Sequence, residues 1–202
     1  MATGRRTAVL PHAGGARMAF RPDGGALAVN GRDNALLDLR AGRAAEAPFT
    51  AADGVRGLAY SPDGRLLATG TTAEGVTLWD GVRQVRRLPV GAEEGEQIDA
   101  LAFSPDGRTL AAAGAQGKVW LWDVAHGVPL GLPAPQHQGP VLALAFSRDG
   151  RALYSVGGDG RLGAHPIDPG VLAREVCARA GATLSPAAWA RLIPWTPYRK
   201  VC

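Results

Sequence analysis

The chain has 202 residues, of which 46% are hydrophobic and 20% are charged. This composition is typical of a globular protein and excludes a disordered or membrane-embedded one. The formal net charge is +4, but the excess lies after Asp168, where five basic residues stand against one acidic residue. The preceding residues hold 17 basic and 17 acidic side chains, so we expect no basic stripe for binding nucleic acid there.

No apolar run reaches the ~20 residues of a membrane-spanning helix. The first residues, MATGRRTAVL, contain two arginines without the apolar core and cleavage site of a secretory signal. We therefore expect a cytoplasmic protein with no membrane span.

One pattern occurs four times along the first 168 residues. Its turn glycines are spaced by 40, 43 and 43 residues, and an aromatic residue stands four positions before each. The glycines are Gly24, Gly64, Gly107 and Gly150, and the aromatic residues are Phe20, Tyr60, Phe103 and Phe146. A constant spacing of this length predicts one supersecondary unit per repeat. The units are predicted near 12–50, 51–93, 94–136 and 137–168.

Each unit predicts a meander of short strands. Apolar runs such as 58–60 and 101–103 predict an inner strand, and the Ser-Pro-Asp-Gly that follows them predicts a tight turn. Second strands are expected at 66–69 and 110–113, and third strands at 76–79 and 119–122. The weaker segment 84–88 predicts a fourth, outer strand.

Two units end in a Trp-Asp pair, Trp79-Asp80 and Trp122-Asp123, and both tryptophans follow the turn glycine by fifteen positions. With the four matching turns, these pairs resemble the WD-repeat β-propeller family. The resemblance implies an all-β fold of about four blades over residues 1–168. It also implies a non-catalytic module that binds protein partners through the loops of its faces.

The blade count leaves two arrangements open, because propellers of this family usually have about seven blades. Residues 5–10 supply either the outer strand that closes a small four-bladed ring or the remnant of an earlier blade in a longer propeller. In the second arrangement the chain is an open arc that exposes the apolar flank of its first blade. Such an edge favours self-association.

The family resemblance implies a hydrogen-bonded set in each blade: a His before the inner strand, a Ser or Thr in the second strand, an Asp in the next turn, and the Trp. The fourth unit matches with His137, Ser155 and Asp159, but has His165 in place of the Trp. The second unit matches with Thr69 and Trp79 only. The third unit has Trp122, but Gln116 stands at the Asp position. The first unit has His12 and Asp33, but Leu39 stands at the Trp position. The implied role is structural, through mutually satisfied buried polar groups.

Other motifs indicate no chemistry. The string Gly158 to Gly163 satisfies G-x-G-x-x-G, but it falls in an expected hairpin turn, without the following helix that dinucleotide binding requires. No pair of His or Cys residues has metal-ligand spacing, and no Gly-x-Ser-x-Gly motif occurs. We therefore expect no enzyme, no cofactor and no metal site. The acidic stretch 92–99 is expected to be a solvated loop between units.

Residues 169–202 predict a short helical tail. Asp168 caps a first helix that begins at Pro169 and ends at Gly181, and Ser185-Pro186 starts a second. The tail is similar to that of actinobacterial WD-repeat signalling proteins, at residues that include Cys177, Trp189, Tyr198 and Cys202. This similarity implies the C-terminal scaffold or sensor part of a bacterial signalling protein.

Two questions about the tail stay open at this point. Cys177 and Cys202 either form a disulfide or remain two thiols, as a reducing cytosol favours. The alternative to a protein-binding scaffold is binding to nucleic acid or an anionic membrane surface, driven by the basic residues of the tail.

Overall fold

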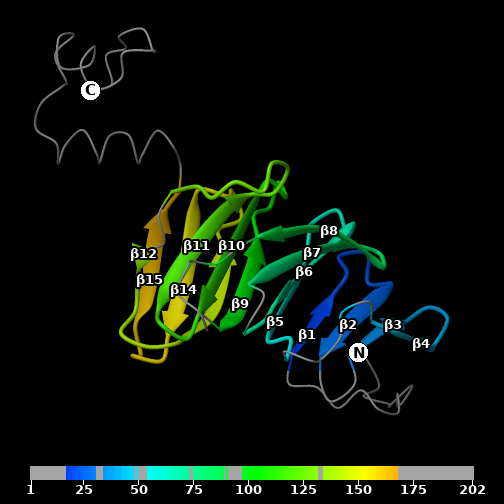
Figure 1. Ribbon diagram of the computed structural model, residues 1–202. Coiled ribbons are helices and arrows are strands. Elements are labelled where there is room, and N and C mark those ends of the chain that lie inside the picture. Colours follow the sequence, from blue (N-terminus) through cyan, green and yellow to red (C-terminus); the bar gives the residue numbers. More distant parts are fainter. Residues whose placement is uncertain are drawn as a thin grey trace, which may run out of the picture.

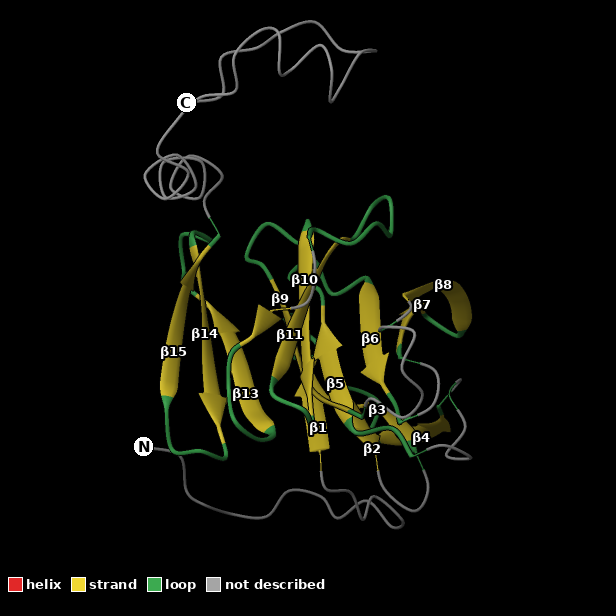
Figure 2. Ribbon diagram, turned by 60° about the vertical axis from the view of Figure 1, so that its left-hand side comes forward, coloured by secondary structure: helices red, strands yellow, loops and turns green. Residues whose placement is uncertain are grey.

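The structure, a computed structural model, describes residues 17–30, 34–47, 49, 54–72, 75–88, 90, 97–131 and 134–167. Within these ranges the regular structure consists of strands alone, which form four antiparallel sheets (Figures 1 and 2). The all-β prediction is therefore confirmed. The predicted helical tail at 169–202 and the expected outer strand at 5–10 lie outside the described residues.

The sheets follow one another along the chain, and we call them blades 1 to 4. Blade 1 holds β1 (Arg17–Phe20), β2 (Ala26–Asn30), β3 (Ala35–Asp38) and β4 (Arg43–Glu46). Blade 2 holds β5 (Gly57–Tyr60), β6 (Leu66–Gly70), β7 (Val76–Asp80) and β8 (Arg83–Leu88). Blade 3 holds β9 (Ile98–Phe103), β10 (Thr109–Gly114), β11 (Lys118–Asp123) and β12 (Ala134–Pro135). The described strands of blade 4 are β13 (Val141–Phe146), β14 (Ala152–Gly157) and β15 (Leu162–Pro166).

Every blade is a meander in which each strand pairs with the next along the chain, as the repeat pattern predicts. One expectation is wrong in part: Ile98 and Asp99, assigned to a solvated loop, belong to β9, and Ile98 is fully buried. The boundaries of the four repeat units, near 12–50, 51–93, 94–136 and 137–168, stay predictions. The G-x-G-x-x-G string runs through the turn between β14 and β15 and into β15, so its hairpin context is as expected.

The hydrophobic core is divided into three clusters, each of which joins two consecutive blades. Ala28 and Phe49 pack with Leu67 between blades 1 and 2. Leu78 and Leu88 pack with Trp122 and their neighbours between blades 2 and 3. The third cluster joins Ala111, Ala113 and Val119 of blade 3 to Val141 and Leu153 of blade 4. A blade has two apolar faces and buries each of them only against a neighbouring blade.

The blades therefore form a row in chain order, with blade 1 and blade 4 at opposite ends (Figure 1). The inner strands pack in the same order, with β1 beside β5, β5 beside β9 and β9 beside β13. The described part of the chain has no helix with the length and apolar character needed to cross a bilayer.

Candidate interaction surface

The four repeated turns between the first and second strands lie at one edge of the row, which we call the turn edge (residues 21–25, 61–65, 104–108 and 147–151). In blade 3, Ser104 accepts a hydrogen bond from the N–H of Thr109 at 2.9 Å and donates its hydroxyl to Asp106 at 2.6 Å. Gly107 has a φ of 71°, which a glycine adopts without strain. Ser61 and Ser147 form the same bonds in blades 2 and 4.

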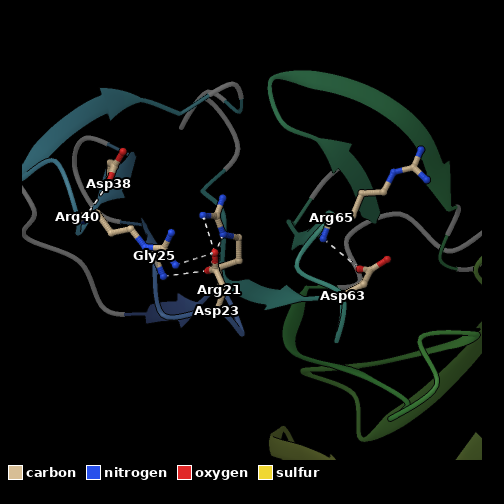
Figure 3. Close-up of polar contacts among 7 residues, drawn as sticks. All are labelled: Arg21, Asp23, Gly25, Asp38, Arg40, Asp63 and Arg65. Carbon is tan, nitrogen blue, oxygen red and sulfur yellow. Dashed lines mark hydrogen bonds and ion pairs between the residues drawn. The ribbon is translucent and has the colours of Figure 1, made fainter.

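Blade 1 builds this turn with a different side chain, because Arg21 stands where the other blades have serine. Its guanidinium donates two hydrogen bonds to Asp23, at 2.8 and 3.0 Å (Figure 3). The N–H of Gly25 donates a third bond to the same carboxylate at 2.9 Å. In blade 1 the guanidinium of Arg21, which we call the Arg21 fork, thus takes the place of the serine hydroxyl. Comparison of the repeat sequences did not predict this replacement.

Hydrogen bonds lower the pKa of the aspartate carboxyls in the turns. The bonds from Arg21, and then that from Gly25, lower the pKa of Asp23 to about 2. Serine hydroxyls, followed by backbone N–H groups, lower the pKa of Asp63, Asp106 and Asp149. The turn edge therefore carries a row of aspartates that are ionised at neutral pH, interspersed with exposed arginines.

Consecutive turns stack on one another along this edge. A Cβ placed at Gly64, Gly107 or Gly150 would lie 3.5, 3.5 or 3.6 Å from the ring Cδ of a proline in the preceding turn. The three prolines are Pro22, Pro62 and Pro105. The proline before the turn Asp in the first three turns was visible in the sequence, but its contact with the next blade was not.

Two grooves open between blades at the turn edge. Groove 1–2 has a volume of about 430 Å³ and is lined by residues that include Arg21, Tyr60 and Arg65. Groove 3–4 has a volume of about 520 Å³, and its lining includes Arg108, Arg148, Leu130 and Ile167. Apolar walls with a few charged groups suit a short protein segment that offers both kinds of side chain.

The Trp-Asp pair of blade 2 lies partly in this region. Asp80 lines groove 1–2 and pairs with Arg65, whose Nε lies 2.9 Å from its carboxylate. Trp79 is half-buried, and its Nε1 donates to the hydroxyl of Thr69 at 3.0 Å. The pair therefore joins strands within blade 2 and shapes the wall of the groove.

The pair of blade 3 differs in its contacts. Trp122 is 1% exposed within the cluster that joins blades 2 and 3, and Ala112 stands where blade 2 has Thr69. Asp123 accepts a hydrogen bond from the N–H of His126 at 2.9 Å. This bond is the largest cause that lowers the pKa of Asp123, and a hydrogen bond from the His126 ring is the next. Trp120 has a buried Nε1 with no hydrogen-bond partner.

The structure brings together His137, Ser155 and Asp159 of blade 4, together with His165. The Asp159 carboxylate lies 3.0 Å from His137 Nδ1, and His137 Nε2 lies 2.7 Å from Ser155 Oγ. His165 Nε2 lies 2.8 Å from the same hydroxyl. In the tautomers that place a proton on His137 Nδ1 and on His165 Nε2, each donor points the same way, from His165 through Ser155 and His137 to Asp159. Such chains are cooperative.

Burial and hydrogen bonds act on the titration of this set in different directions. Burial lowers the pKa of His165 below its ordinary value of 6.5, and the nearby His137 lowers it further. Burial alone raises the pKa of Asp159, but bonds from the N–H groups of Arg161 and Gln138, with that from His137, bring it below its ordinary value.

The order Asp159, His137, Ser155 is also that of a hydrolytic triad. However, Ser155 is fully buried, and its hydroxyl is held between two imidazole rings. A substrate carbonyl therefore has no access to Ser155 Oγ, and the arrangement ties β14 and β15 to the segment before β13. Among the residues that the structure describes, no cluster of three His, Cys, Asp or Glu could hold a metal ion.

The tail residues named from the sequence, Cys177, Trp189, Tyr198 and Cys202, lie outside the described residues. The seven blade residues named from the sequence fall into two groups according to where they lie in the fold. Trp79, Trp122, His137 and Ser155 lie within or between blades. Asp80, Asp123 and Asp159 lie at strand ends or turns.

Comparison with known families agrees with the repeated blades. The sequence model of the family described as "WD domain, G-beta repeat" matches residues 47–80, 85–123 and 132–162, slightly more than half of the chain. The first two matches end at the Trp-Asp pairs of blades 2 and 3. Strands β1 to β4 of blade 1 precede the first match. No curated protein matches the sequence.

Proposed function

Since the chain belongs to the WD-repeat family, whose repeats typically act as non-enzymatic modules that bind other proteins, we propose that it is a protein–protein interaction scaffold without catalytic activity. The observation that carries the proposal is the turn edge. It combines rigid, stacked turns with two grooves whose walls are both apolar and charged. Loops and turns held on a rigid scaffold are where binding residues concentrate.

Groove 3–4 is the stronger candidate contact within this edge. It is the larger of the two grooves, and Leu130 in its wall is 48% exposed. Arg108 and Arg148 line the same space together with Asp106 and Asp149, so a partner segment with charged and apolar side chains would pair with both kinds of wall.

The proposal extends to the setting of the module. We propose that it is the scaffold or sensor part of a cytoplasmic bacterial signalling protein, supported by the similarity of the tail at Cys177, Trp189, Tyr198 and Cys202 to actinobacterial signalling proteins. Self-association through an open blade edge is a second contact that the proposal includes.

The test compares two charge-reversed variants. Arg108→Glu/Arg148→Glu changes groove 3–4, and Arg161→Glu changes an exposed arginine in the β14–β15 turn at the opposite edge. Proteins retained from a bacterial extract by the wild-type chain are identified, and one is purified for titration by calorimetry. We expect the groove variant to weaken binding at least about tenfold, because it removes both arginines from a wall that also holds Asp106 and Asp149 and so reverses the balance of charge there, while Arg161→Glu binds normally.

Equal binding by the wild-type chain and the groove variant would show that groove 3–4 is not the contact. Loss of binding in Arg161→Glu alone would move the contact to the opposite edge.

A further inference from the structure

The two ends of the row expose the two halves of the interface that joins blades within the chain. Positions counted from the turn glycine show this, because the same positions form the contact in every blade pair. Four, six and twelve positions after Gly107 lie Ala111, Ala113 and Val119, which pack against blade 4. These three are at most 6% exposed.

The corresponding residues of blade 4 are apolar and exposed. Tyr154, Val156 and Leu162 stand four, six and twelve positions after Gly150, and their exposed fractions are 40%, 38% and 70%. They lie on one face, since Val156 pairs with Leu162 and Tyr154 pairs with Ala164 across β14 and β15. We call this surface, Tyr154, Val156, Leu162 and Ala164, the outer face of blade 4.

Blade 1 exposes the opposite half of the same interface. In blades 2 to 4, the residues six and four positions before the turn glycine pack against the preceding blade. They are Leu58 and Tyr60, Leu101 and Phe103, and Leu144 and Phe146. Their counterparts in blade 1, Met18 and Phe20, are 62% and 60% exposed. With Leu39, at the Trp position, they form the free face of blade 1.

The two faces account for most of the exposed large hydrophobic side chains. Ten such side chains are exposed among the described residues, and six of them belong to these two faces. Contiguous apolar surface of this kind marks an interaction site. Scattered surface hydrophobics would have no reason to fall at the positions that pack between blades elsewhere in the chain.

The stacked turns end at the same two places. A Cβ placed at Gly24 would meet nothing within 4 Å, whereas those at the other three turn glycines meet the preceding turn. The last turn has Arg148 where the others have the stacking proline. The stacking of turns therefore ends at blade 1 and at blade 4, the two blades whose apolar faces are exposed.

We propose that the outer face of blade 4 binds the free face of blade 1 of a second copy of this chain, head to tail. The contact continues the blade-to-blade interface already repeated three times within the chain. Two copies joined at both ends form a ring of eight blades, within the range of known propellers, and a rotation that does not close gives longer chains. The inference rests on the self-association in the proposed function and names its two faces.

The experiment measures the molar mass of the purified 202-residue chain by sedimentation and light scattering from about 1 to about 100 μM, a range that detects micromolar dissociation constants. A reductant is present, so that a disulfide between Cys177 or Cys202 of two copies does not contribute. We expect the mass to rise from one copy to two as concentration rises. A single-copy mass over the whole range would overturn the proposal.

Two variants, each at one end, identify the contact. Leu162→Glu changes blade 4, and Phe20→Lys changes blade 1; both side chains are more than half exposed, so circular dichroism should show an unchanged fold. Each variant alone should have the mass of one copy. The matched control is Val82→Glu, since Val82 is 77% exposed in the β7–β8 turn, and it should associate like the wild type.

Mixing the variants separates head-to-tail contact from other arrangements. An equal mixture of Leu162→Glu and Phe20→Lys contains one unaltered pair of faces and one Glu–Lys pair, so we expect the two-copy mass to return. If Phe20→Lys alone still associates like the wild type, the contact does not need the free face of blade 1 and the head-to-tail proposal is wrong. Partner binding at groove 3–4, titrated with the same variants, should stay normal, so failure of this inference is distinguishable from failure of the scaffold function.

Discussion

His165 Nε2 lies 2.8 Å from the hydroxyl of Ser155, in the position where blade 2 has Trp79 Nε1 bonded to Thr69 at 3.0 Å. Counted from the turn glycines, the two pairs occupy identical positions. An imidazole therefore replaces an indole as the partner of the same buried hydroxyl. The replacement keeps the hydrogen bond and introduces a titratable group, whose pKa burial lowers in the folded chain.

Removal of this bond should destabilise the chain. His165→Phe keeps an aromatic ring but has no donor, and we expect the free energy of unfolding to fall by about 1–3 kcal/mol, because the Ser155 hydroxyl loses a buried partner. Denaturant unfolding followed by circular dichroism measures the change. His126→Phe is the control, since its side chain is 75% exposed, and an equal loss in both variants would contradict the role of the bond.

Stability should depend on pH through His165. Because the pKa of His165 is lower in the folded chain than its ordinary value of 6.5, the unfolded chain binds this proton more readily. Its contribution to stability is complete above about 6.5 and is lost as the pH falls toward the folded pKa. His165→Gln keeps a donor without titration, so its unfolding free energy should fall less steeply between pH 7 and 5.

The comparison of these two pH profiles reports on His165 and on the groups coupled to it. Titrating groups far from His165 are present in both chains, so their contributions cancel in the difference. Parallel profiles for the wild type and His165→Gln would show that His165 does not titrate differently on folding.

The two tryptophans of β11 should respond differently to truncation. Trp122 is 1% exposed in the core cluster, whereas Trp120 has a buried Nε1 without a partner. Trp120→Phe removes that unsatisfied donor, which offsets part of the lost packing, so we expect a cost below about 1 kcal/mol. Trp122→Phe should cost more, about 1–3 kcal/mol. Equal costs in thermal unfolding would contradict a penalty for the Trp120 donor.

The charge of Asp23 should depend on Arg21. Arg21→Gln removes the guanidinium that, more than any other group, lowers the pKa of this carboxyl to about 2, so the pKa should rise toward its ordinary value of 3.8. Titration of the carboxyl carbon by NMR measures it directly. Arg17→Gln changes another arginine of blade 1 that is not among the causes of the shift, and the Asp23 pKa should not move there.

The repeats could be located from the sequence because the signals are local. The Ser-Pro-Asp-Gly turn closes on itself through bonds between residues at most five apart, such as Ser104 to Thr109, and its glycine has the positive φ that the motif predicts. Strand order within a blade follows from the short turns, since antiparallel neighbours joined by a hairpin must pair. The all-β fold and the WD-repeat family were thus predictable without tertiary information.

The candidate surface was only partly predictable. The sequence indicated loops and turns as the contact, but not the Arg21 fork, the ion pair of Arg65 with Asp80, or the proline stacking between turns. The Arg21 fork lies within one turn, but the other three repeats have serine at this position and gave no signal for it. The Arg65–Asp80 ion pair joins residues fifteen apart, and the proline stacking joins consecutive blades. The approach of these two sets of side chains depends on how strands and sheets pack, which local patterns do not encode.

The four units, with the positions of their turns and apolar residues, follow from the amino-acid order, because hydrogen bonds and strand pairing within about 40 residues decide them. Counted from the turn glycine, Ala111 and Tyr154 occupy the same apolar position of the repeat, and so do Phe103 and Phe20. Which of these residues are covered depends on how the blades pack, because burial requires a neighbouring blade. Ala111 and Phe103 have one in the structure, whereas Tyr154 and Phe20 remain exposed at the two ends of the row.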